Sequence, residues 1–204
     1  MDRVWYHHYD PRVPHSLEYP EECLPVALER NALTLPGVIA TEFFGARLTY
    51  AALWNQILRF ANALSQLGVK PGDKVAIMLP NIPEFVYSCF AVFQSGAVAV
   101  LLNTGSTPYE LAYLLNNSDA KILVTHAAGE KRYLEIKDQL ATCRNLLTID
   151  PTQNAFLSEN ASDIAAPPSV PIDADDPAVM IYTAGLTGKP QGLSLIHISE
   201  PTKP

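Results

Sequence analysis

The chain has 204 residues, of which 48% are hydrophobic and 17% are charged, a composition that suits a globular domain with a sizeable core and excludes a disordered chain. Fourteen Lys and Arg residues against 21 Asp and Glu residues give a formal charge of −7 without a Lys/Arg block, so we expect neither nucleic acid nor a basic membrane-surface patch, and small molecules are the expected partners. Three cysteines, Cys23, Cys89 and Cys143, are odd in number and too far apart for a CxxC pair, which argues against a disulfide framework or zinc site and favours the reducing cytoplasm.

The region 1–47 is rich in proline, and we predict an irregular lead-in with one short helix near 26–31. Charged residues occur from Asp2 onward without an apolar segment, so no secretory signal is predicted. The early histidines have no further ligand at metal-binding spacing, and no metal site is predicted.

An amphipathic helix is predicted after Leu48. Thr49 can cap its start, and Gly68 can end it. Its apolar positions recur at helical spacing, and they are Leu53, Ile57, Ala61, Leu64 and Leu67.

A strand, a helix and a second strand are predicted next. The strands are 74–79 and 97–102, and the helix begins at Pro83 and ends before Gly96. The apolar face expected for this helix consists of Phe85, Val86, Cys89, Phe90 and Phe93.

The apolar stretch 85–102 is also long enough to suggest a membrane span. The polar and helix-ending residues Gln94, Ser95 and Gly96 lie at its middle, which favours a buried helix followed by a buried strand. We therefore predict no transmembrane segment, and peripheral membrane contact stays open.

Thr107, Pro108 and Glu110 form a capping-box pattern that starts a helix running to about residue 116. The alternation continues with a strand at 121–125, a helix at 130–140 and another strand at 146–149. A surface connection at 151–176 and a final strand at 177–182 follow. Repeated strand–helix units imply an α/β fold with a mostly parallel sheet and flanking helices. His126 follows one of these strands and is interpreted as a packed or solvated residue.

The strand 177–182 leads directly into a loop rich in glycine and threonine. Glycines let backbone N–H groups approach anionic oxygens, threonine hydroxyls add donors, and Lys189 adds positive charge, a combination suited to polyphosphate. A Walker A motif is excluded because the glycines Gly185 and Gly188 are only three positions apart and Pro190 follows the lysine. A loop that merely turns the chain stays an alternative.

The segment 182–192 resembles the phosphate-loop motif of the AMP-dependent synthetase and ligase family, the adenylate-forming acyl-CoA synthetases, which runs Tyr-Thr-Ser-Gly-Thr-Thr-Gly-Lys-Pro-Lys-Gly. Further segments resemble landmarks of this family in the same order, at 48–50, 67–77, 80–85, 96–98 and 102–111. The resemblance runs from about residue 20 to 197, and the opening residues are most similar to long-chain fatty acid–CoA ligases.

The resemblance implies that ATP and a carboxylic acid, here a fatty acid, form an acyl-adenylate, from which the thiol of coenzyme A displaces AMP. It implies ATP, Mg²⁺ and CoA as ligands, with catalytic residues beyond this part of the family sequence. ATP phosphates are assigned by the resemblance to Thr183, Gly185, Thr187, Gly188, Lys189 and Gly192.

Three positions depart from the motif: Ala184 and Leu186 replace hydroxyl residues, and Gln191 replaces a lysine. Loss of that positive charge would weaken phosphate binding by about 1.5–3 kcal/mol if the family lysine contacts phosphate directly. A sub-family that tolerates the changes is the alternative interpretation.

The expected organisation is an irregular lead-in at 1–47, a partial adenylation domain at 48–192 and a tail at 193–204 that resembles translated sequencing-adapter sequence. Because later segments of the family are missing, we expect this chain to lack ligase activity. A stand-alone nucleotide-binding or non-catalytic interaction module is the alternative function.

Overall fold

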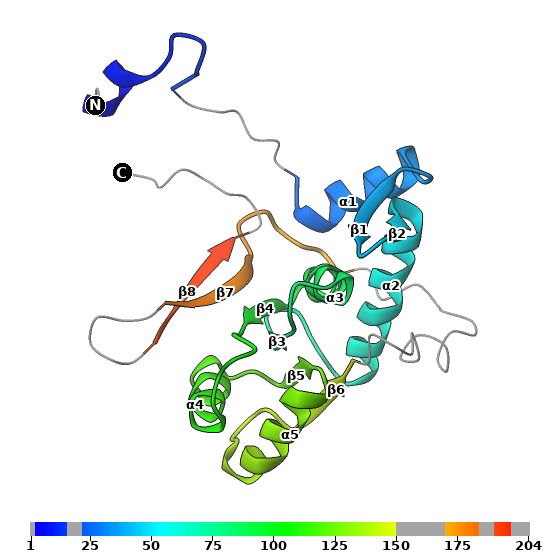
Figure 1. Ribbon diagram of the computed structural model, residues 1–204, viewed down its shortest axis with the longest axis vertical. Helices are drawn as coiled ribbons and strands as arrows, with labels where there is room; N and C mark the ends of the chain where they lie inside the picture. Colours follow the sequence, from blue (N-terminus) through cyan, green and yellow to red (C-terminus); the bar gives the residue numbers. More distant parts are fainter. Residues whose placement is uncertain (1–2, 16–21, 150–169, 184–189, 197–204) are drawn as a thin grey trace.

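The structure is a computed structural model that describes residues 3–15, 22–149, 170–183 and 190–196. Its main sheet has six strands in the order β6-β5-β3-β4-β7-β8 (Figure 1). The strands are β3 (Lys74–Met78), β4 (Val98–Leu101), β5 (Ile122–Thr125), β6 (Asn145–Thr148), β7 (Pro177–Thr183) and β8 (Gln191–Ile196). The first five are parallel and β8 is antiparallel to β7, which confirms the mostly parallel sheet.

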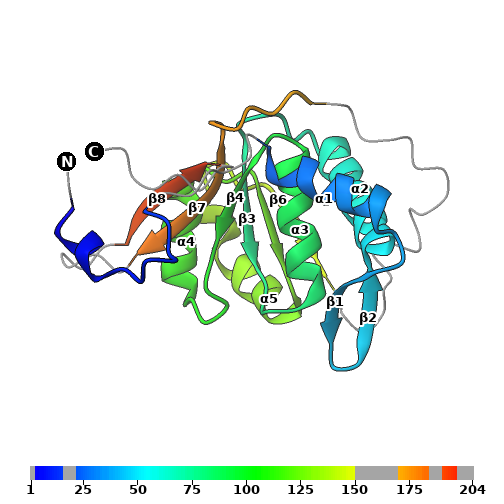
Figure 2. The ribbon, with the colours of Figure 1, turned by 90° about the horizontal axis from the view of Figure 1, so that it is seen from above.

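Helices cover both faces of this sheet, which confirms the α/β class (Figure 2). The helices are α1 (Leu24–Thr34), α2 (Tyr50–Gln66), α3 (Pro83–Gln94), α4 (Pro108–Ser118) and α5 (Ala127–Ile136), with short 3₁₀ helices η1 (Val4–His8) and η2 (Lys137–Gln139). Side chains of β3 alternate between two clusters, since Val75 and Ile77 pack with α1, α2 and α3, whereas Ala76 and Met78 pack with α4 and α5.

Helix α2 follows the predicted pattern closely. The hydroxyl oxygen of Thr49 accepts a hydrogen bond from the Ala52 amide at 3.2 Å, which confirms the predicted cap. The predicted apolar positions are buried except Leu67, which follows the helix and is 38% exposed. The chain reverses immediately afterwards at Gly68, whose φ of 82° is favourable only for glycine.

Helix α3 and strand β4 confirm the buried helix and strand predicted for the apolar stretch. Within the described residues no helix is both long and apolar enough to cross a membrane. The predicted apolar face packs against the core, although Phe85, Val86 and Phe90 are only half-buried. The buried residues are Tyr87, Ser88, Cys89, Ala91, Val92 and Phe93. Contact with both α1 and α2 as well as with the sheet widens the buried arc beyond one stripe.

The lead-in is more regular than predicted. Besides α1, it contains an antiparallel hairpin of β1 (Ile39–Phe43) and β2 (Ala46–Thr49), in which Glu42 faces Arg47. Phe44 and Gly45 form the turn with φ values of 47° and 84°. Phenylalanine is not one of the residues that normally signal such a turn, so the hairpin was not predictable from its sequence.

Two further differences lie in the second half of the chain. Helix α5 begins at Ala127, three residues before its predicted start at residue 130, and it includes Gly129 despite the poor helix propensity of glycine. Strand β8 was not predicted, and its ladder with β7 continues past residue 192, where the sequence suggested a boundary. Most of the connection predicted at 151–176 and all of 197–204 lie outside the described residues.

Candidate functional site

The candidate site lies where β4 and β7 end. Because β3 to β7 are parallel, their carboxyl ends meet at one edge of the sheet. The chain leaves β3 toward α3 on one face and leaves β4 toward α4 on the opposite face. Such a change of direction between neighbouring strands creates the crevice in which α/β proteins usually bind ligands.

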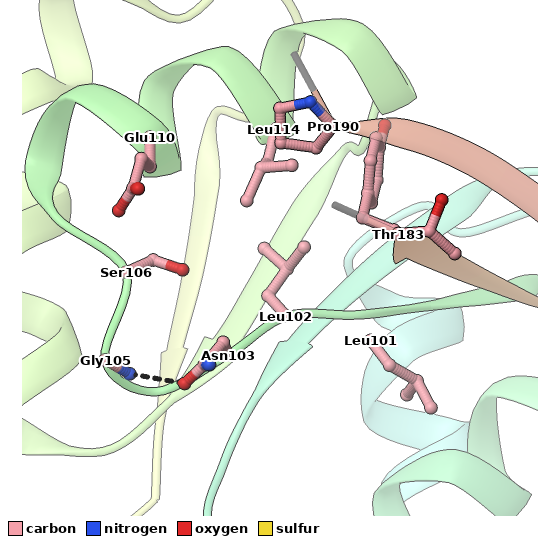
Figure 3. A pocket seen from close by; sticks show the side chains of 10 residues that line it. Leu101, Leu102, Asn103, Gly105, Ser106, Glu110, Leu114, Thr183 and Pro190 are labelled. Atoms are coloured by element: carbon pink, nitrogen blue, oxygen red, sulfur yellow. Dashed lines mark hydrogen bonds between the residues drawn. The ribbon is translucent and has the colours of Figure 1, made fainter. Parts of the chain in front are cut away.

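A cavity of about 370 Å³ opens at this edge (Figure 3). Its walls come from the end of β4, the loop before α4, the first turns of α4, the end of β7 and Pro190, which immediately precedes β8. Leu101, Leu102 and Leu114 form apolar walls, while the polar residues that line it are Asn103, Ser106, Glu110, Tyr182 and Thr183. The site therefore combines an apolar surface with a few convergent polar groups, as small-molecule sites do.

The loop between β4 and α4 satisfies its own polar groups. The Gly105 amide donates to Asn103 Oδ1 at 2.8 Å. The amide and hydroxyl of Thr107 donate to Glu110 Oε2 at 2.8 and 2.9 Å, and the Glu110 amide donates to Thr107 Oγ1 at 3.3 Å, which confirms the predicted capping box. Arg132 of α5 also donates to the Thr104 carbonyl.

The charge on the wall of the cavity determines which ligands can bind there. Hydrogen bonds from the backbone and side chain of Thr107 lower the pKa of Glu110, so its carboxylate is ionised at neutral pH. Glu110 is the only charged residue that lines the cavity within the described chain. A phosphate is therefore disfavoured beside α4 and needs positive charge from another segment.

The sequence predicts a phosphate-binding loop at 183–192, and the structure describes the two ends of this segment. Gly185, Thr187, Gly188 and Lys189 lie outside the described residues. Thr183 ends β7 and lines the cavity, and its partner across the ladder is Gln191. The two described ends of the segment are therefore paired at the edge of the sheet where the cavity lies.

Gly192 has a packing role in β8. It faces Tyr182, and a Cβ at this position would lie 3.3 Å from Met180 Sδ and 3.4 Å from the Tyr182 ring. It is not among the residues that line the cavity. Close packing between the two strands therefore accounts for glycine at this position.

Helix α4 contacts β7 and Pro190, the residue just before β8, and these contacts were not predicted from the sequence. The hydroxyl of Tyr113 donates to the Pro190 carbonyl at 3.3 Å, and the hydroxyl of Tyr182 donates to Asn117 Oδ1 at 2.8 Å. The spacing of Tyr113 and Asn117 places them on one face of the helix, but their partners are 77 and 65 residues away. No local signal in the sequence reveals such contacts.

The remaining candidates have structural interpretations. His126 occupies the N-cap position of α5 and is half-buried, with Nδ1 buried and unpartnered. All three cysteines are free and buried, and burial raises the pKa of the Cys89 and Cys143 thiols to about 12. The described residues contain no cluster of three metal-ligating side chains.

The curated proteins to which this chain is similar include several CoA ligases. It is 27% identical over 225 residues to the long-chain-fatty-acid–CoA ligase of Bacillus subtilis, covering 96% of this chain and 40% of that protein. It is 36% identical to the feruloyl-CoA synthase of an Amycolatopsis species, and the match covers 82% of this chain and 32% of that protein. It is 33% identical to the crotonobetaine/carnitine–CoA ligase of Escherichia fergusonii, and the match covers 74% of this chain and 31% of that protein. The chain thus spans 31–40% of the length of these relatives.

Solved structures with a similar fold include proteins of the same kind. The N-terminal domain of FACL13 from Mycobacterium tuberculosis matches with a TM-score of 0.76 and 27% identity, covering 86% of this chain and 44% of that one. VinN matches with a TM-score of 0.77 and 26% identity, covering 89% and 47%. A family model described as AMP-binding enzyme matches residues 28–199, most of the sequence. Because this match extends over more than half of the sequence, the chain belongs to the AMP-binding enzyme family.

Proposed function

We propose that this chain binds the phosphates of ATP through segment 183–192, as part of a ligase that activates a carboxylic acid. The observation that carries the proposal is the position of this segment, whose ends, Thr183 and Gln191, are paired beside a cavity at the carboxyl edge of the sheet. Ligands of α/β proteins bind at this edge, and the segment adds the positive charge that the cavity walls lack.

The six residues assigned to the ATP phosphates each have a proposed role. Gly185 and Gly188 let backbone N–H groups approach the phosphate oxygens, Thr183 and Thr187 donate hydroxyl hydrogen bonds, and Lys189 contributes charge. Gly192 supports the segment by allowing β8 to pack closely against β7. Residues 48–192 would then belong to an adenylation domain.

The proposed reaction has two steps, in which ATP and the acid form an acyl-adenylate and pyrophosphate, and the thiol of CoA then displaces AMP. Oxygen donors dominate the polar lining of the cavity, which suits a hard cation such as Mg²⁺ bound together with the nucleotide. Mg²⁺ neutralises phosphate charge in such complexes. Thr183, which lines the cavity, is the residue proposed to hold phosphate next to this cation.

A fatty acid is the proposed acid, because the match to the Bacillus subtilis ligase extends over nearly all of this chain. The other relatives are named for ferulate and for crotonobetaine or carnitine, so the common class is carboxylic acids. The buried free cysteines suit a reducing cytoplasm, the proposed compartment.

Isothermal titration of the 204-residue chain with Mg·ATP tests the proposal. We expect saturable binding that Lys189→Ala weakens by at least about tenfold, since a charge-assisted hydrogen bond contributes about 1.5–3 kcal/mol. Lys131→Ala, which removes the same charge from an exposed site on α5, is the matched control and should bind as the unmodified chain does.

Gln191→Lys provides the reciprocal test, because it restores the charge of the family motif and should tighten binding. A folded chain that does not bind Mg·ATP, or one whose affinity is the same in all three variants, contradicts the proposed function.

A further inference from the structure

One face of α4 contacts both strands that flank the proposed phosphate-binding segment. Tyr113 holds Pro190, the residue immediately before β8, and Asn117 holds Tyr182, the next-to-last residue of β7. Glu110 and Leu114, which line the cavity, lie on the same face by helical spacing. The helix that forms one wall of the cavity therefore also holds the two strands opposite.

The position of Pro190 depends strongly on this contact. β8 is an edge strand, and β7 is its only neighbour in the described sheet. Proline has no backbone N–H, so its carbonyl is the one backbone group through which Pro190 can be hydrogen-bonded. That carbonyl accepts from Tyr113, which ties the start of β8 to a helix packed on the sheet.

The Tyr182 contact acts on the other strand. Burial raises the pKa of Tyr182, so its hydroxyl stays protonated and remains a donor at neutral pH. The acceptor, Asn117 Oδ1, is uncharged, so this contact does not change with protonation near neutral pH. Tyr182 pairs with Gly192 in the ladder, so the contact that holds Tyr182 also helps to hold β8.

We propose that Tyr113 and Asn117 are positioning residues that fix the separation of Thr183 and Pro190, and thereby the two ends of the phosphate-binding segment. This inference rests on the proposed function. It assigns α4 a part in nucleotide affinity in addition to its packing in the core.

Three single variants and one control separate positioning from stability. Tyr113→Phe, Asn117→Ala and Tyr182→Phe each remove one hydrogen bond to the strands. Tyr133→Phe is the matched control, because Tyr133 of α5 donates a similar bond, 3.0 Å long, to the Cys143 carbonyl away from the cavity. We expect each of the first three to weaken Mg·ATP binding about two- to tenfold, while the control retains full affinity.

A double-mutant cycle adds a sharper requirement. Asn117→Ala and Tyr182→Phe remove the same bond, so the double variant should bind no more weakly than either single variant. The thermal stability of every variant is compared with that of Tyr133→Phe. The inference is overturned if the three variants are as stable as this control and lose no more affinity for Mg·ATP than it does.

Hydrogen exchange gives a second readout that does not require ATP. Faster exchange in Tyr113→Phe than in Tyr133→Phe at those amides of β8 that pair with β7 supports positioning, and equal rates contradict it. If the unmodified chain fails to bind Mg·ATP, the proposed function is wrong and this inference falls with it. If it binds and the three variants bind equally well, only the inference is wrong.

Discussion

Gly129 shows how a single side chain, or its absence, sets the distance between a helix and the sheet. A Cβ built at this position would overlap Thr125 Oγ1 and lie 2.6 Å from Met78 Cε. Thr125 cannot turn away easily, because it is fully buried and its hydroxyl donates to the Met78 carbonyl at 3.0 Å. Helix α5 can approach β3 and β5 this closely only because residue 129 has no side chain.

Gly129→Ala should therefore lower the free energy of unfolding by about 1–3 kcal/mol, as overpacked core positions do. The better helix propensity of alanine, worth about 1 kcal/mol, offsets only part of the cost. Urea denaturation followed by circular dichroism measures the change. Gly37→Ala is the control, since a Cβ there meets nothing within 4 Å, and an equal loss in both variants would contradict the packing explanation.

At the scale of the element, the start of α4 is stabilised by an ionised carboxylate. Glu110 accepts two hydrogen bonds from Thr107, and these bonds lower its pKa. A lowered pKa in the folded state means that the stabilisation is fully present above the pKa of an unfolded glutamate, about 4.3, and is lost as the pH falls through the folded value.

We accordingly expect acid to destabilise the unmodified chain more than the Glu110→Gln variant. The glutamine can still accept a hydrogen bond but has no charge to lose on acidification. Thermal unfolding midpoints at neutral pH and near pH 3.5 give the comparison. Identical changes with pH in the two proteins would show that the carboxylate does not contribute in this way.

Elements with local signals were predictable from the sequence, and those defined by distant contacts were not. The caps at Thr49 and Thr107 involve residues three positions apart, and both helices begin where predicted. The hairpin turn at Phe44 has no usual turn residue before its glycine, and β8 depends on pairing with β7 across a loop. The same difference applies to the site, where Thr183 was predicted from its motif but Tyr113 and Asn117 are defined only by contacts made in the folded chain.

At the scale of the whole molecule, one sheet separates two apolar clusters. Leu115 is fully buried with α4 and α5 on one face, whereas Trp54 of α2 is 8% exposed on the other. Because β3 contributes side chains to both clusters, loss of packing on one face weakens the strand on which the other face depends.

Leu115→Ala should lower the free energy of unfolding by about 2–5 kcal/mol, as truncation of a buried leucine does. Trp54 is a specific fluorescent reporter once the other tryptophan is removed by Trp5→Phe. In that background the midpoints from Trp54 fluorescence and from far-ultraviolet circular dichroism should move together, because the two faces unfold in one transition. Leu33→Ala, at a side chain that is 75% exposed, should have little effect. Separate midpoints for the two probes would show that the faces unfold independently.

The order of the strands also bears on how the sheet can assemble while the polypeptide is being synthesised. β3 emerges first, β4 adds on one side of it and β5 on the other, β6 follows outside β5, and β7 and β8 extend the side of β4. Each of the five later strands joins an outer edge that already exists, and none of them has to enter between two paired neighbours. Growth from the centre outward lets early strands pair before later ones leave the ribosome, which shortens the time that each apolar edge stays open to wrong partners.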